Sequence, residues 1–192
     1  MMSQSMKVVI RVLLACSFFQ LAACSVVYSV NPVGENPVQL DAQQWDGDWR
    51  GTEGVMKIKV KDAEAGILQV AWIEDMELQQ FDVYLMESNG WQFFNVKDEE
   101  DENDASDGYV WGRIRYHENT ILLWDPDIKK FRSLVRDGTL PGEARKSGKD
   151  KQNESDVVLE KLTQAHLLLI TSEEKGVLFD WDEPLVLLKI SD

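Results

Sequence analysis

The sequence predicts a mainly β protein of the α+β class, built as an antiparallel curled sheet or small barrel with two short helices inserted before the last strands. Apolar and polar residues alternate in several runs between Trp45 and Trp124, which is the period of a strand with one buried face. Asn89-Gly90 separates two such runs and is a strong hairpin signal. Beyond Asp125 the apolar spacing becomes helical, and it returns to a strand pattern at the end.

Each expected strand is indicated by apolar residues at alternate positions or by a short apolar run. The first three strands carry inward positions at Met56, Ile58 and Val60, then at Leu68, Val70 and Trp72, then at Phe81, Val83 and Leu85. A strand at 91–96 follows the Asn-Gly turn, and strands at 109–116 and 120–124 flank a turn at 117–119. The run 157–159 is a further strand, and 185–190 is expected to be a buried closing strand.

Two helices are expected in the last third of the chain. Asp125 is a good N-cap, Pro126 suits the first helical position, and Gly138 ends the helix. One face of this helix carries Ile128, Phe131, Leu134 and Val135. Thr163 caps a second helix through Ile170, with Gly176 near its end. The polar segment 142–156 between them predicts a mobile excursion.

The N-terminus carries a secretion signal. Lys7 and Arg11 precede an apolar run, 12–19, that is too short to span a bilayer. The next residues, Leu21-Ala22-Ala23-Cys24, resemble the lipobox of bacterial lipoproteins, which implies cleavage between Ala23 and Cys24 and lipid attachment at Cys24. Residues 1–23 are then the removed signal peptide, 24–40 the lipid anchor and tether with room for a short edge strand, and 41–192 a single β-rich globular domain. The alternatives are the poorer match Leu13-Leu14-Ala15-Cys16 and an ordinary signal peptide or membrane anchor with an incidental Cys24.

Location and charge limit the partners. Ser25 rather than Asp follows the cysteine, so the lipoprotein resemblance implies sorting to the outer membrane of a Gram-negative cell, facing the periplasm. The formal net charge is −14, which repels nucleic acid and anionic lipid headgroups. We therefore expect no nucleic-acid partner and a membrane attachment that depends on acylated Cys24. Removal of the signal and acylation leave no thiol for a disulfide, because Cys16 and Cys24 are the only cysteines.

The triplet Gly47-Asp48-Trp49 enters the first strand and resembles the Gly-x-Trp signature of lipocalins and related calycin barrels. The resemblance implies a barrel whose closed end is plugged by Trp49, with a basic residue of the last strand, here Lys189, lying across the indole. The family's other motifs are not visible in this chain, and two helices interrupt its late strands. The alternative interpretation of Trp49 is a core anchor without that relationship.

Catalytic and metal-binding patterns are sparse. His117 lies in a predicted turn beside Glu118, and His166 lies on the second expected helix. The sequence has no Gly-x-Ser-x-Gly elbow and no His-Glu-x-x-His spacing, so we predict no enzyme, no cofactor and no metal site. The acidic run 98–107 lacks the spacing and the glycine of an EF-hand and is expected to be a solvated loop, the alternative being a weak divalent-cation site.

Aromatic and basic residues on the strands have two interpretations each. Trp72, Trp91, Trp111 and Trp124 are expected to pack in the core or across strands, the alternative being a ligand cage. Arg113 and Arg115 alternate with Ile114 and predict a charged row on the sheet surface rather than an anion pocket.

Three functional classes follow. The first is a non-catalytic envelope lipoprotein that docks on another protein through its sheet or its late helices. The second is a lipocalin-like binder of an apolar small molecule or lipid, which requires inward residues too small to fill the barrel. The third is a hydrolase that uses His117 with an acid, and it has the least support from sequence motifs.

Overall fold

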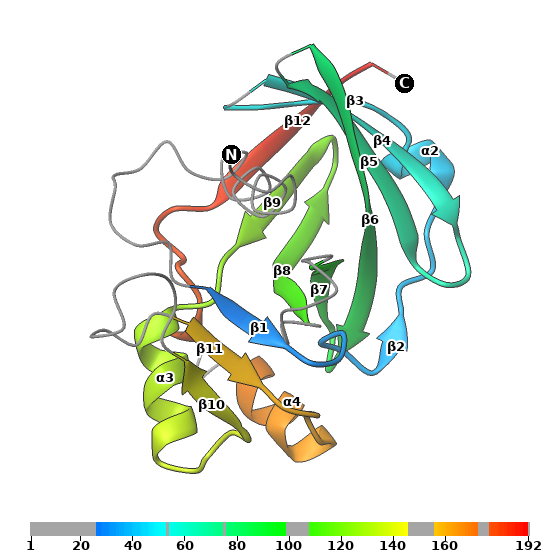
Figure 1. Cartoon of the computed structure of the whole chain (residues 1–192). Coiled ribbons are helices and arrows are strands. Elements are labelled where there is room, and N and C mark those ends of the chain that lie inside the picture. Colours follow the sequence, from blue (N-terminus) through cyan, green and yellow to red (C-terminus); the bar gives the residue numbers. More distant parts are fainter. Residues whose placement is uncertain are drawn as a thin grey trace.

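The computed structural model describes residues 26–52, 54–74, 76–98, 108–145, 156–172 and 177–191. Within these residues, eight strands close into an antiparallel barrel, because β9 pairs with both β8 and β12 and β12 pairs with β3 (Figure 1). The strands are β3 (Gly47–Gly51), β4 (Gly54–Asp62), β5 (Ile67–Glu74), β6 (Glu77–Ser88), β7 (Trp91–Lys97), β8 (Tyr109–His117), β9 (Thr120–Trp124) and β12 (Leu185–Ser191). The predicted mainly β fold is confirmed, in its barrel form.

A second layer packs on the outside of the barrel. The strands β1 (Val27–Ser29), β11 (Asp156–Leu159) and β10 (Gly142–Arg145) extend the sheet outward from β8. Figure 1 shows them at one side of the barrel together with the helices α3 (Ile128–Arg136) and α4 (Gln164–Thr171). The two layers enclose a separate apolar cluster that includes Phe93, Trp111, Phe131 and Phe179.

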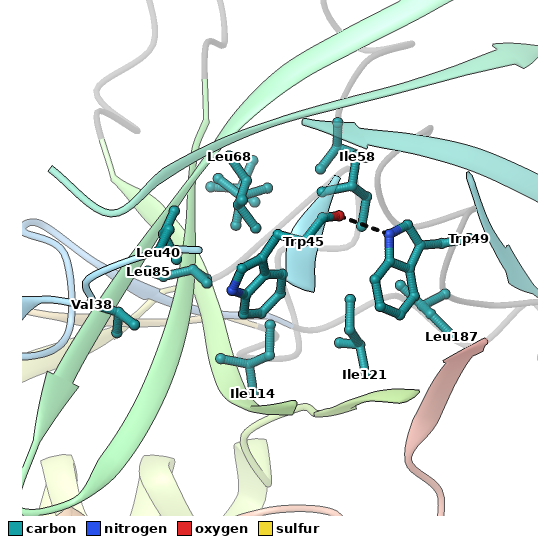
Figure 2. Close-up of a cluster of buried hydrophobic side chains, with 13 residues drawn as sticks. Val38, Leu40, Trp45, Trp49, Ile58, Leu68, Leu85, Ile114, Ile121 and Leu187 are labelled. Carbon is teal, nitrogen blue, oxygen red and sulfur yellow. Dashed lines mark hydrogen bonds between the residues drawn. The ribbon is translucent and has the colours of Figure 1, made fainter. Parts of the chain in front are cut away.

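The barrel interior holds the other apolar cluster, part of which is shown in Figure 2. The alternation expected from the sequence sets its composition: Ile58, Leu68, Val70, Val83 and Leu85 are buried, while the residues between them face outward or are partly exposed. The Asn89-Gly90 turn joins β6 to β7 with positive φ at both residues, 51° and 76°, as a two-residue hairpin requires.

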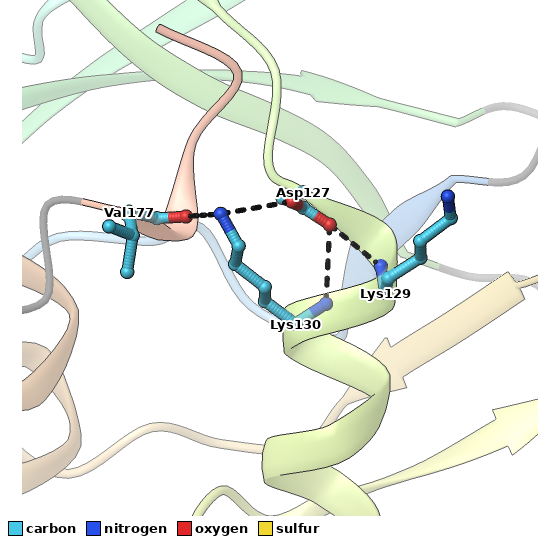
Figure 3. A network of polar contacts seen from close by, with 4 residues as sticks. All are labelled: Asp127, Lys129, Lys130 and Val177. Atoms are coloured by element: carbon cyan, nitrogen blue, oxygen red, sulfur yellow. Dashed lines mark hydrogen bonds and ion pairs between the residues drawn. The ribbon is translucent and has the colours of Figure 1, made fainter.

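The first long helix begins later than predicted. The N-cap of α3 is Asp127 rather than Asp125, and Pro126 forms an isolated bridge with Phe179 instead of the first helical turn. Asp127 Oδ1 accepts hydrogen bonds from the backbone amides of Lys129 (3.0 Å) and Lys130 (3.2 Å), and its Oδ2 lies 3.1 Å from Lys130 Nζ (Figure 3). Lys130 Nζ also donates to the Val177 carbonyl. Because the first free amides of the helix donate to Asp127, the helix begins after Asp127 and Asp125 lies outside it.

The second helix agrees with its prediction. Thr163 caps α4, and the His166 side chain completes a capping box by accepting from the Thr163 amide. The helix ends at Thr171 with Ser172 as its C-cap, one residue beyond the predicted Ile170, and Gly176 lies outside the described residues.

Three other segments correct the expectations. The part of the predicted tether that is described, 26–40, belongs to the fold: β1 pairs with two strands, β2 (Asn36–Pro37) pairs with β6, and Val27, Val33, Val38 and Leu40 are buried. Part of the predicted polar excursion, 142–145, is strand β10 on β11, and the rest up to 155 lies outside the described residues. The closing strand β12 alternates, with Leu187 buried but Val186 and Leu188 exposed.

Candidate functional site

One end of the barrel is closed by a short helix and two tryptophans. Helix α2 (Ala42–Trp45), capped by Asp41, ends with Trp45, whose side chain enters the barrel among Ile58, Leu68 and other inward residues (Figure 2). Trp49 follows on β3 and is 0% exposed. Its Nε1 donates a hydrogen bond to the Trp45 carbonyl at 3.0 Å, and this bond ties the helix end to the first barrel strand.

Lys189 of the last strand lies over this plug. Its Nζ is 6.0 Å from the centroid of the Trp49 indole and donates to the carbonyls of Gln43 (3.0 Å) and Gln44 (3.4 Å). Glycine at position 47 allows the end of β12 to approach β3 closely. Gly47 has a φ of 145°, and a Cβ there would lie 2.2 Å from the Ser191 carbonyl oxygen. Two residues of the Gly-x-Trp triplet therefore have a structural role at the closed end: Gly47 allows the close approach of β12, and Trp49 fills the interior and binds the end of α2.

The inward residues toward the other end are less completely covered. Met56, Trp72, Phe81, Phe94, Leu123 and Leu185 pack against the barrel core yet stay partly exposed. Trp72 and Phe81 meet edge to face with their centroids 5.2 Å apart. The deep part of the interior, by contrast, is filled by large buried side chains such as Trp49, Leu85 and Ile121. This arrangement offers apolar contact area at that end of the barrel, which we call the mouth, rather than a deep interior site.

An exposed apolar surface lies outside the barrel, on the strands next to this mouth. We define the outer apolar face as Val55, Ile73, Met76, Leu78, Val186, Leu188 and Ile190, all of them exposed. Ile73 and Leu78 are direct partners across β5 and β6, with exposed fractions of 76% and 68%, and Met76 between them is 97% exposed.

The strand registers connect this tip with the rest of the face. Arg50 on β3 pairs with Val55 of β4 on one side and with Leu188 of β12 on the other. Continuing the β4–β5 register from the Lys57–Ala71 pair brings Val55 level with Ile73. In Figure 1 these strands lie on the side of the barrel away from α3 and α4. Exposed apolar surface that continues over several strands is typical of a contact site.

The strand period also predicts which apolar residues of this face point outward, although only the inward positions were named from the sequence. With Leu68, Val70 and Trp72 inward, the period of two places Ile73 outward, and with Phe81 and Val83 inward it does the same for Leu78. Apolar residues at outward positions can therefore be recognised from the strand pattern alone.

Ion pairs surround the closed end and β4. Lys57 Nζ lies 2.7 Å from Asp48 Oδ1, and Ser191 Oγ donates to Asp48 Oδ2 at 2.7 Å; the hydrogen bonds from Lys57 and then Ser191 lower the pKa of Asp48. Lys61 Nζ lies 2.5 Å from Asp82 Oδ2, and that hydrogen bond raises the pKa of Lys61. The first pair joins the neighbouring strands β3 and β4, and the second reaches across β5 to join β4 with β6; both are at least partly solvent-exposed and form no reactive centre.

In the described part of the chain, the contacts of the two histidines are with residues close to them in sequence. His117 is the last residue of β8, with its side chain 69% exposed and its Nε2 4.0 Å from Glu118 Oε1. His166 is occupied by the capping box of α4. Neither contact positions a nucleophile, and the hypothesis of a His117 hydrolase gains no geometric support.

Several expectations concern residues outside the described ranges. Cys24, the Ala23–Cys24 cleavage site and Ser25 are among them, as is the acidic run from residue 99 to 107; only Asp98 of that run is described, and it is buried. Within the described residues, no three His, Cys, Asp or Glu side chains gather closely enough to hold a metal ion. No helix in those ranges has both the length and the apolar character needed to cross a bilayer.

The strand tryptophans divide between the two clusters. Trp72 belongs to the barrel interior, while Trp91, Trp111 and Trp124 belong to the outer cluster, so their predicted packing role is confirmed. Arg115 is exposed on the outer face of β8, as expected for a charged row. Arg113 differs, because it is half-buried against Trp91, Trp124 and Trp181.

The chain was also compared with known proteins. Neither the protein-family models nor the curated proteins nor the solved structures gave a match.

Proposed function

We propose that this protein is a non-catalytic envelope lipoprotein, held to the outer membrane by acylated Cys24 and facing the periplasm, whose outer apolar face docks on a partner protein. The observation that carries the proposal is the exposure of Ile73, Met76 and Leu78 at one tip of the barrel. Burying an exposed Leu or Ile side chain contributes about 1.5–3 kcal/mol. A few such side chains on one face are therefore enough to anchor an interface.

A protein is the better occupant than the membrane surface itself. The chain has a formal net charge of −14, and anionic headgroups repel such a protein. On the outward side of β4, Val55 is followed by Lys57, Lys59 and Lys61. Lys57 forms an ion pair with Asp48, and Lys61 forms one with Asp82. The face thus combines apolar area with paired charges, which is the usual composition of a protein interface.

The experiment uses the anchored protein and two matched variants. A partner protein should co-purify in stoichiometric amount with the unchanged protein from detergent-solubilised membranes. We expect the yield of this partner to fall at least about tenfold with the Ile73→Ser/Leu78→Ser variant. The control is Leu168→Ser, which changes a residue that is 53% exposed on helix α4 and does not belong to the outer apolar face. Equal partner yield in both variants, at equal thermal stability, would argue against docking through this face.

A second candidate function is favoured by the barrel mouth. The partly exposed inward residues Met56, Trp72, Phe81 and Phe94 offer contact to an apolar small molecule or acyl chain, and the plug of Trp49 and Lys189 supports the calycin resemblance. Native mass spectrometry of the protein from cells distinguishes this function. A mass excess that disappears on denaturation, and that Phe81→Asp abolishes, supports a captured ligand; identical masses leave docking alone.

A further inference from the structure

The outer surface of the barrel carries an arginine held between indole rings. The Cζ atom of Arg113 lies 3.7 Å from the centroid of Trp91, 4.7 Å from Trp181 and 5.5 Å from Trp124. Arg113 lies on β8, Trp91 on β7, Trp124 on β9 and Trp181 in the segment before β12, so the cluster joins the β7–β9 strands to a segment far along the chain. Trp181 also contacts both other indoles, at 6.0 Å from Trp91 and 5.2 Å from Trp124. We call these four residues the arginine cage.

The guanidinium has no anionic partner within the described part of the chain. No ion pair and no hydrogen bond of the Arg113 side chain is formed there, although 34 acidic residues outnumber 20 basic ones in the sequence. Desolvation by its surroundings and then the charge of Arg115 lower the pKa of Arg113, and no carboxylate offsets them. A charge that is half-buried without a counterion costs stability, which a structural role in packing alone does not require.

The geometry leaves the donors of Arg113 available. A guanidinium stacked on an indole uses its flat face, whereas its five N–H groups point outward in the plane of the fork. That fork matches the two oxygens of a carboxylate or phosphate. Arg115 is exposed two residues further along β8, on the same face of the strand, and adds a second positive charge. The surrounding rings reduce the local dielectric and strengthen attraction to an anion.

We propose that the arginine cage together with Arg115 is a binding site for an oxyanion group, a carboxylate or a phosphate, which Arg113 holds through its fork and Arg115 attracts. The three indoles position Arg113 and provide apolar area beside the bound group. The site is independent of the outer apolar face, which lies on other strands.

The test follows the arginine Nε–H and indole Nε1–H signals of the whole protein by NMR during titration with sodium phosphate or sodium acetate at constant ionic strength. We expect saturable shifts of the Arg113 and Trp91 signals that sodium chloride does not cause. Arg115→Gln should weaken binding by about three- to tenfold, and Arg113→Lys, which keeps the charge without the fork, by at least about tenfold. The control Arg50→Gln, at an exposed arginine on β3, should bind like the unchanged protein.

The outcomes separate the sources of the anion. Saturation by phosphate alone identifies a phosphate group, saturation by acetate alone identifies a carboxylate, and saturation by both identifies the shared chemistry. Shifts that stay linear with concentration, or that persist unchanged in Arg113→Lys and Arg115→Gln, would overturn the proposal. Both variants retain a side chain long enough to cover the neighbouring strands, and an unchanged thermal midpoint shows that the fold survives.

Discussion

Replacing Trp49 by Phe tests how the closed end of the barrel is held together. Trp49 is fully buried, and its Nε1 donates to the Trp45 carbonyl at 3.0 Å. Losing this hydrogen bond costs about 1 kcal/mol. The smaller ring removes two carbons and the ring nitrogen from the core, and at about 0.8 kcal/mol per carbon the lost burial costs about 2 kcal/mol. We therefore expect a loss of about 3 kcal/mol in the free energy of unfolding.

Thermal unfolding followed by circular dichroism measures the effect. For a chain of this size about 1 kcal/mol corresponds to roughly 2–4 °C, so the midpoint should fall by about 6–12 °C. The matched control is Trp72→Phe, because Trp72 is only partly buried against the core and should lose less than about 1.5 kcal/mol. Equal midpoints for the two variants would refute the view that Trp49 and α2 seal the barrel.

Three further predictions concern single contacts. Asp127→Ala should cost about 1 kcal/mol at neutral pH by removing the α3 cap, whereas Asp127→Asn should keep most of the cap. Although desolvation opposes ionisation, hydrogen bonds from Lys130 and Lys129 lower the pKa of Asp127 in the folded protein. The stability advantage of Asp127 over the Asn variant is therefore present above about pH 4 and is lost as the pH falls through the lowered pKa. Urea unfolding of both proteins at a series of pH values measures this advantage. A gap between the two proteins that grows toward low pH would contradict this sign. Asn95→Ala should cost about 3 kcal/mol and speed hydrogen exchange of the Val33 amide, because Asn95 bonds to both Val33 N and O; unchanged exchange would show that the segment is held otherwise. Gly112→Ala should cost about 1–3 kcal/mol in chemical unfolding, since its Cβ would lie 2.6 Å from both the Phe94 ring and the Trp124 carbonyl oxygen, and a neutral effect would mean that β7 shifts freely.

The parts of the fold that depend on local pattern were predictable from sequence. Alternation identified the strands around Ile58, Val70 and Val83, and Asn89-Gly90 identified a hairpin whose geometry needs only its own two residues. Thr163 was likewise a sufficient local signal for the start of α4. Closure of the sheet depends on β9 pairing with β12 across 60 intervening residues, which no local period reports.

The wrong predictions share a physical cause. A short edge strand was expected in the tether, but β1 is an internal strand, because it gains its hydrogen bonds from β8 and β11, which lie far along the chain. Strand β10 is polar because it lies at the edge of the sheet and is held through its backbone. Asp125 was predicted as the cap, but backbone pairing of residues 125–127 with 178–180 holds it outside the helix, and Asp127 caps α3 instead.

The candidate sites show the same division between local and distant information. Outward apolar residues such as Ile73 and Leu78 follow from the strand period. The arginine cage does not, because Trp181 lies in a segment without a periodic pattern and reaches Arg113 only in the folded chain.

Docking through the outer apolar face is tested most directly by photo-cross-linking in living cells, with the acylated full chain and a photoreactive amino acid at Leu78 or at Leu168. Both positions are exposed and apolar, at 68% and 53%, but Leu78 lies at the β5–β6 hairpin whereas Leu168 lies on helix α4. The proposed function predicts one discrete cross-linked protein from Leu78 that disappears when Ile73 is changed to Ser, and none of that mass from Leu168. The same product from both positions, or none from Leu78, would contradict it.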